Sequence, residues 1–306
     1  MTIISNSTSA FFERSTMGLS DLRNMAEKLQ GQLSSGQKLA RSSDDPVAAS
    51  KLRLLSRSDA LSQIDTVNAN RATSDLSLTD TALGTFADYI SRARELAMQA
   101  GNDTLTNSQR IGIATELAEL HGNLVALANS RDSAGHSLFG GETAGNAYTL
   151  DAGGNAVYVG TASAGELPLG DGQVVSRGIT GPDFLNFDVN GTPTNLMAVV
   201  KGLADALQGA SPDPASVARD SLDALSSGLD AVTTNQTVIG ARLAWIDLTT
   251  DRRIDLGEMR AGEEKEIGAT DMADAVARLQ EVMLALEASQ ASFAKLAKLT
   301  LFDVVG

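Results

Sequence analysis

The sequence predicts a mainly α-helical fold: a long antiparallel helical rod with coiled-coil-like termini and a small β-rich domain inserted in its middle. Apolar residues recur every 3.5 residues over long stretches on both sides of the chain's centre, which is typical of helices that pack along one seam. Residues 135–191 hold 13 of the 28 glycines, so helix gives way to tight turns there. Aromatic residues make up only 4% of the chain, so the core must consist of smaller apolar residues packed through narrow seams.

The first predicted element is an N-terminal assembly helix within residues 1–44. Its apolar residues follow a 3-4-3-4 spacing, which places them on one face of a helix. They are Leu19, Leu22, Ala26, Leu29 and Leu33.

The N-terminal part of the rod is predicted over residues 45–134. Asp45 can accept a hydrogen bond from an unpaired N–H, and Pro46 suits the first turn of a helix. Residues 47–83 contain no glycine or proline, so this helix is expected to be long. Its continuation and the segment after it have apolar seams of their own. These are Leu76, Leu83, Phe86, Ile90 and Ala97, and then Ile113, Leu117, Leu120, Leu124 and Leu127.

A β-rich variable insert is predicted over residues 135–195. Short alternating runs at 156–159 and 184–189 are typical of strands between tight turns. A flexible loop is the alternative that the glycine content leaves open. Because the insert has no helical seam to offer, we expect that replacing about residues 140–190 by a short linker leaves assembly largely intact.

The C-terminal part of the rod is predicted over residues 196–268, and a C-terminal assembly helix over residues 269–306. The rod seam is Leu222, Leu225, Leu229, Val232, Gln236, Ile239, Leu243 and Ile246. The last helix holds nine positions in strict 4-3 alternation. They are Met272, Val276, Leu279, Met283, Leu286, Gln290, Phe293, Ala297 and Thr300.

The two end helices each offer a single apolar seam. Two helices that pair alone bury little area per residue, whereas ordering the backbone costs about 1–2 kcal/mol per residue. We therefore expect the ends to be loose in the monomer and to become ordered when neighbouring subunits cover them. Intramolecular packing of both ends on the rod is the alternative.

Composition excludes several classes of function. The 306-residue chain has a formal charge of −14, and without a basic stripe we expect neither nucleic-acid binding nor binding to an anionic membrane. It contains no cysteine, which excludes disulfides and thiolate metal sites. Its start lacks the basic and apolar regions of a cleaved signal peptide, and no apolar run is long enough to span a membrane.

No constellation of catalytic, cofactor-binding or metal-binding residues is evident. The only histidines are His121, in a polar helical stretch, and His136, at a turn, and no HExxH motif is present. Asp44 and Asp45 are better explained by capping a helix than by carboxylate catalysis. Gln236 and Gln290 are polar residues on apolar seams, which either are tolerated there or set the register between helices.

Several stretches resemble the flagellin superfamily and, within it, the FlgL-type hook–filament junction family (hook-associated protein 3). The resemblance covers about residues 1–140 and 215–306. Asp-Asp-Pro at 44–46 followed by Val-Ala-Ala, and Leu-Phe-Asp at 301–303, favour the junction form over filament flagellin. The matching stretches are 32–49, 93–102, 127–132, 138–141 and 286–303.

The resemblance implies a structural, non-enzymatic protein that joins the hook to the filament and templates flagellin polymerisation. It implies self-association in a ring and contact with a neighbouring hook-associated protein and with flagellin. It further implies export to the extracellular flagellum through the type III channel, with a cytosolic chaperone on the C-terminal helix. The seam positions on the two end helices are then the expected contact residues. Filament flagellin, a surface adhesin or receptor, and a secreted hydrolase are the rival interpretations.

Overall fold

The computed structural model describes residues 2–132 and 134–305. The chain forms two compact units. One, here called the terminal unit, consists of residues 1–60 and 255–306, and the other, the central unit, of residues 61–254. Two 55-residue helices, α2 (Pro46–Ala100) and α6 (Pro214–Gly268), contribute residues to both units.

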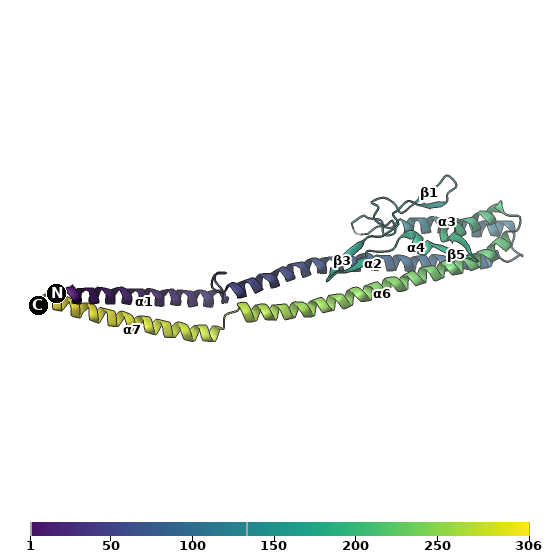
Figure 1. Ribbon diagram of the computed structural model, residues 1–306. Coiled ribbons are helices and arrows are strands. Elements are labelled where there is room, and N and C mark those ends of the chain that lie inside the picture. Colours follow the sequence, from purple (N-terminus) through teal and green to yellow (C-terminus); the bar gives the residue numbers. More distant parts are fainter. Residues whose placement is uncertain (1, 133, 306) are drawn as a thin grey trace. The chain divides into compact units, whose positions relative to one another are not determined.

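The terminal unit consists of helices. Its longest members are α1 (Thr2–Ser35) and α7 (Met272–Val305), which run side by side (Figure 1). Phe12 of α1 contacts Phe293 of α7, with 5.4 Å between the ring centres, while Gly36 and Thr270 are hydrogen-bonded at the other ends of these helices. The pair is therefore antiparallel.

The central unit is built on residues 61–100 of α2, residues 214–254 of α6 and the helix α3 (Asn107–Ala128). A capping box starts α3, in which Thr106 and Gln109 satisfy each other's backbone N–H groups. The predicted α2 seam is fully buried: Leu76, Leu83, Phe86, Ile90 and Ala97 are all solvent-inaccessible.

The predicted insert contains six strands in the described part of the chain, paired as three two-stranded antiparallel sheets. The turn that joins the middle two strands has positive φ at Gly170, Asp171 and Gly172, which explains its two glycines. The strands are β1 (Tyr148–Leu150) with β2 (Ala156–Tyr158), β3 (Glu166–Gly170) with β4 (Gln173–Ser176), and β5 (Asn186–Val189) with β6 (Thr192–Asn195).

Three short helical segments follow or separate these strands. They are α4 (Gly181–Leu185), α5 (Leu196–Asp205) and the π-helical turn η1 (Ala206–Ala210). The predicted fold class, mainly α with helical ends and a small β region, is therefore confirmed. The five predicted segment boundaries remain predictions.

The insert belongs to the hydrophobic core. Phe139 and Phe184 are solvent-inaccessible and pack against Phe86 of α2, with ring centres 5.9 and 5.0 Å away. Leu169 and Val175 of the β3–β4 hairpin are buried in the same cluster. Removing residues 140–190 would take Leu169, Val175 and Phe184 out of this core and expose it, so such a deletion is expected to destabilise the central unit, and its effect on assembly stays a prediction.

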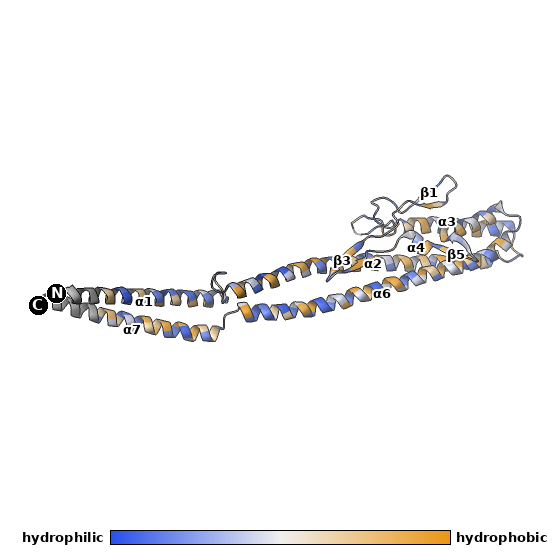
Figure 2. Cartoon of the chain, in the orientation of Figure 1, coloured by the Kyte–Doolittle hydropathy of each residue, from blue (hydrophilic) through white to orange (hydrophobic). Residues whose placement is uncertain are grey.

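Polar contacts also hold the β3–β4 hairpin on the two long helices of the central unit. Asn68 of α2 donates to the carbonyl of Pro168 (3.0 Å), and Arg253 of α6 donates to that of Leu169 (2.5 Å). Apolar and polar residues alternate along the long helices in Figure 2. The hairpin thus links α2 to α6 through both main-chain and side-chain contacts.

Candidate assembly interface

The end helices carry the predicted assembly residues, and on α1 these share one half-buried face. Leu19, Leu22, Leu29 and Leu33 are all half-buried. They continue, at 3- and 4-residue steps, from Phe12, which contacts Phe293 of α7. None of residues 10–35 is fully buried. The α1 seam therefore covers α7 only partly and leaves apolar area in contact with solvent.

On α7, the predicted seam divides between two faces. Leu279, Leu286 and Phe293 are half-buried, whereas Met272, Val276 and Met283 are exposed, Met283 by 51%. The sequence also places two glutamines on apolar seams. Gln290 of α7 is exposed, and Gln236 of α6 is half-buried. The side chains of Ala297 and Thr300 lie outside the described residues.

The inner stripe of α7 includes positions that the sequence analysis missed. Ala275 and Val282 are buried, and they alternate with Leu279, Leu286 and Phe293 at 4-3-4 steps. Alanine and valine are smaller than methionine and leucine, and a seam placed on the larger apolar residues lies one helical position away from its centre. An alternation of small and large residues at the same period was the signal that could have located it.

A second apolar surface therefore lies on the outer face of α7. It consists of Met272, Val276, Met283 and Leu284, the last 69% exposed. Solvated apolar side chains gathered on one face of a helix are typical of surfaces that become buried in an assembly. Met272, Val276 and Met283 follow one line beside the buried positions of α7, and Leu284 lies about 100° further round the helix. We call this group of four residues the outer α7 stripe.

A hollow of about 470 Å³ lies between α1 and α7. Phe11, Leu19 and Leu22 line it from α1, and Ser289 and Phe293 from α7. Small polar side chains stand where a closely packed helix pair would have leucine. The pair is thus incompletely packed by its own residues.

The two connections inside the terminal unit are paired with each other. Gly36, with φ of 69°, ends α1, and its carbonyl accepts the N–H of Thr270 (3.0 Å). The N–H of Lys38 donates to the carbonyl of Gly268 (2.8 Å). Between these two hydrogen bonds, Gln37 and Ala269 pair as an isolated antiparallel bridge. The chain therefore leaves α1 and enters α7 through one short antiparallel contact.

The acidic pair before α2 acts on backbone groups. Asp45 Oδ1 accepts the N–H groups of Val47 and Ala48 (3.1 and 3.0 Å) at the start of α2, and Pro46 is its first residue. Asp44 accepts the N–H of Arg41 (3.0 Å), and this bond lowers the pKa of its carboxyl. Both carboxylates thus accept hydrogen bonds from backbone N–H groups and stabilise the path of the chain at the start of α2.

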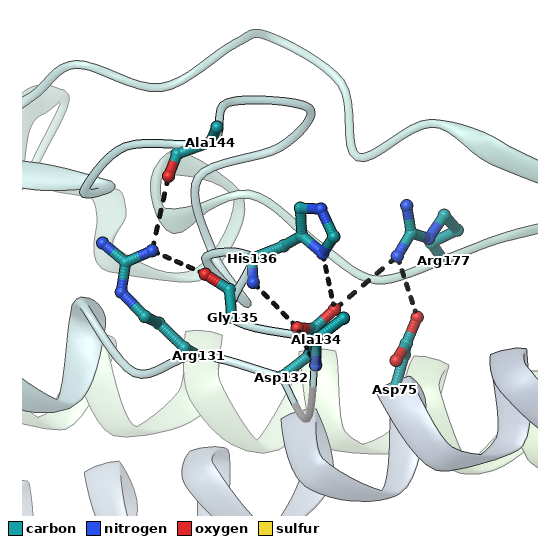
Figure 3. Close-up of polar contacts among 8 residues, drawn as sticks. All are labelled: Asp75, Arg131, Asp132, Ala134, Gly135, His136, Ala144 and Arg177. Atoms are coloured by element: carbon teal, nitrogen blue, oxygen red, sulfur yellow. Dashed lines mark hydrogen bonds and ion pairs between the residues drawn. The ribbon is translucent and has the colours of Figure 1, made fainter.

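The histidines lie in the central unit and serve structure. His121 is buried on α3, and this burial lowers its pKa. His136 lies at a turn, as predicted, and its N–H donates to Asp132 Oδ1 (2.8 Å) (Figure 3). Burial opposes ionisation of Asp132, but the N–H groups of His136 and Ala134 outweigh it and lower the pKa of Asp132.

Ion pairs connect that loop to other elements. Arg177, just after β4, lies 3.2 Å from Asp75 of α2 and 3.7 Å from Asp132 (Figure 3). Within residues 2–132 and 134–305, no three His, Asp or Glu side chains are placed to hold a metal ion. Nor does any described helix have the length and apolarity needed to cross a membrane.

Comparison with known proteins gives matches at both the family and the chain level. Residues 4–144 match the bacterial flagellin N-terminal helical region. Flagellar hook-associated protein 3 of Escherichia coli is 26% identical over 314 residues, covering 97% of this chain and 98% of that protein. The protein of the same name from Salmonella typhimurium is 33% identical over 135 residues, covering 44% of this chain and 43% of that protein.

The fold is similar to that of a solved structure. Flagellar hook-associated protein 3 of Legionella pneumophila superimposes with a TM-score of 0.64 and 17% identity. The match covers 71% of this chain and 98% of that one.

Proposed function

We propose that this chain, which by these similarities is a flagellin-superfamily protein of the hook-associated protein 3 (FlgL) type, is a structural subunit joining the flagellar hook to the filament. The observation that carries the proposal is the outer α7 stripe. Its apolar side chains are solvated in the single chain, and burying them against other subunits is favourable by about 25 cal/mol per Å².

The two halves of this role need different surfaces. A junction subunit must offer filament-like surfaces to flagellin on one side and meet a neighbouring hook-associated protein on the other. Similarity to hook-associated protein 3 of Escherichia coli extends over nearly the whole chain, both end helices included. We therefore propose that the subunit templates flagellin polymerisation, and that copies of it associate in a ring.

Export and protection of the end helices are part of the same proposal. An apolar stripe exposed on a helix is an aggregation hazard before assembly. A cytosolic chaperone that covers the outer α7 stripe would remove that hazard, as a groove covers an amphipathic helix. We propose that the protein is then exported through the flagellar channel without a cleaved signal, works outside the cell and catalyses no reaction.

Immunogold labelling of intact cells tests the proposal. A single band of label at the hook end of the filament is expected. Label along the whole filament would instead identify a filament flagellin, and label on the cell body would identify a surface adhesin or receptor.

A deletion strain provides the complementary test. Without the adaptor, exported flagellin must nucleate a new ring from loose ends, and must order them before neighbours stabilise them. We expect hooks without filaments in electron micrographs and unpolymerised flagellin in the culture medium. Filaments of normal length on the mutant would rule out the junction role.

A further inference from the structure

Two exposed stripes of opposite charge lie on the terminal unit's other two helices. The first is on α2, where Val47 and Leu54 are 79% and 63% exposed. Arg53 and Arg57, also exposed, lie beside them on the outer side of the helix. We call these four residues the basic α2 stripe.

The second stripe is on the last turns of α6. Asp255, Met259, Gly262 and Glu266 follow one another at 4-3-4 steps, so they share one face of the helix. All four are exposed, Met259 by 71%. This acidic α6 stripe thus carries two acidic residues and an exposed methionine, whereas the basic α2 stripe carries two arginines and two exposed apolar residues.

Neither stripe is neutralised within the described part of the chain. The ion pairs between α2 and α6 in this unit are Lys51–Glu263 and Asp59–Arg260, and they use other residues. Arg53 and Arg57 are moreover one helical turn apart, and such a like-charge pair destabilises a helix by about 0.2–0.5 kcal/mol. Acidic groups from outside the chain would remove that repulsion.

The two stripes lie at different heights. The Asp59–Arg260 ion pair and the contact of Leu52 with Gly268 set the levels of α2 and α6. Counted from these contacts, Leu54 and Met259 differ by six or seven residues, about 10 Å, and Arg57 and Asp255 by seven or eight residues, about 11 Å. Copies displaced by about 10 Å along the helices would therefore bring Leu54 to Met259 and Arg57 to Asp255.

We propose that the basic α2 stripe of one copy docks on the acidic α6 stripe of the next copy. This inference rests on the proposed self-association and names the surfaces that carry it. A second copy is the partner that the observations favour, because one chain carries both halves of the complementary pair and the same axial displacement brings both residue pairs together. Contact between two different patches builds rings or helical arrays, and opposite charge sets register and disfavours like-with-like contact.

Cysteine cross-linking of the purified full-length protein tests the contact directly, since the natural chain has no cysteine. Leu54→Cys and Met259→Cys variants are oxidised separately and after mixing. We expect the mixture to yield several-fold more disulfide dimer than either variant alone. A mixture of Met25→Cys with Met259→Cys is the matched control, because Met25 is an exposed methionine of α1. Equal yields in all samples would overturn the proposal.

Charge reversal tests the electrostatic part. Arg53→Glu with Arg57→Glu in the Leu54→Cys chain, or Asp255→Arg with Glu266→Arg in the Met259→Cys chain, should each lower the mixed yield about tenfold. Mixing the two reversed chains should restore it. These residues are exposed, so unchanged thermal melting verifies folding. Failure of the restoration would overturn the pairing.

The cross-linking result and the junction role can fail separately. Immunogold label at the hook end with no cross-linking preference would refute the stripe contact alone. Restored cross-linking with label along the whole filament would refute the junction role alone and leave the contact in place.

Discussion

The central and terminal units are built from the same kind of long helix, yet they bury their seams to different depths. Leu76, Leu83 and Ile90 of α2 are solvent-inaccessible in the central unit, whereas Leu22 and Leu29 of α1 are half-buried in the terminal unit. The difference in burial arises from how many elements pack against each helix. In the central unit α3, α5 and the β hairpins cover the helices, while α1 packs mainly against α7. A two-helix layer cannot bury its seam alone, so the terminal unit has apolar surface available for neighbours.

The largest expected effect on stability comes from replacing one phenylalanine by alanine in each unit. Phe184→Ala removes a solvent-inaccessible ring from the central aromatic cluster and should cost about 3–5 kcal/mol of unfolding free energy. Phe12→Ala removes a half-buried ring from the α1–α7 pair and should cost roughly 1 kcal/mol. Urea denaturation followed by circular dichroism measures both. Equal costs would mean that the two units are equally well packed.

The contrast between these phenylalanines also shows what the sequence could predict. Periodicity located the long helices and the buried α2 seam, because a 3.5-residue repeat is a local property of the chain. It could not place Phe139 and Phe184 in the α2 core, since they lie in a glycine-rich stretch whose packing depends on distant elements. It also assigned the α7 seam by its largest apolar residues and so missed the buried Ala275 and Val282.

The second prediction separates the two faces of α7. Leu279→Ser with Leu286→Ser removes inner-stripe side chains and should loosen the α1–α7 pair in the monomer. Met283→Ser with Leu284→Ser changes exposed side chains, so the monomer should melt as before while filament attachment in cells is lost. Differential scanning calorimetry and motility assays distinguish the pairs. Normal motility of the Met283–Leu284 variant would show that the outer stripe is not an assembly surface.

Limited proteolysis sharpens the comparison without any mutation. If the ends become ordered only in the assembly, a low dose of trypsin should trim about 40 residues from each end and leave residues 61–254 intact. Mass spectrometry of the resistant fragment locates the cut sites. Ends that survive as long as the central unit would favour intramolecular packing of α1 and α7 as the main source of their order.

The smallest effect is a pH dependence confined to the central unit. His121 is buried on α3, and burial, reinforced by nearby Lys201, lowers the pKa of its imidazole below the ordinary value of 6.5. The unfolded chain therefore takes up a proton more readily than the folded chain. The stability associated with neutral His121 is fully present above pH 6.5 and is lost as the pH falls through the lowered pKa.

Denaturation at several pH values between 5 and 7 measures this dependence, and His121→Gln should flatten it. His136→Gln is the matched control, because it removes the chain's other histidine from an exposed turn. The terminal unit contains no histidine, so the rate at which trypsin trims the ends should show no matching change after correction for trypsin's own pH profile. A slope that survives His121→Gln would assign the dependence to other groups. An acid-induced change in end trimming would show that the two units do not respond to pH independently.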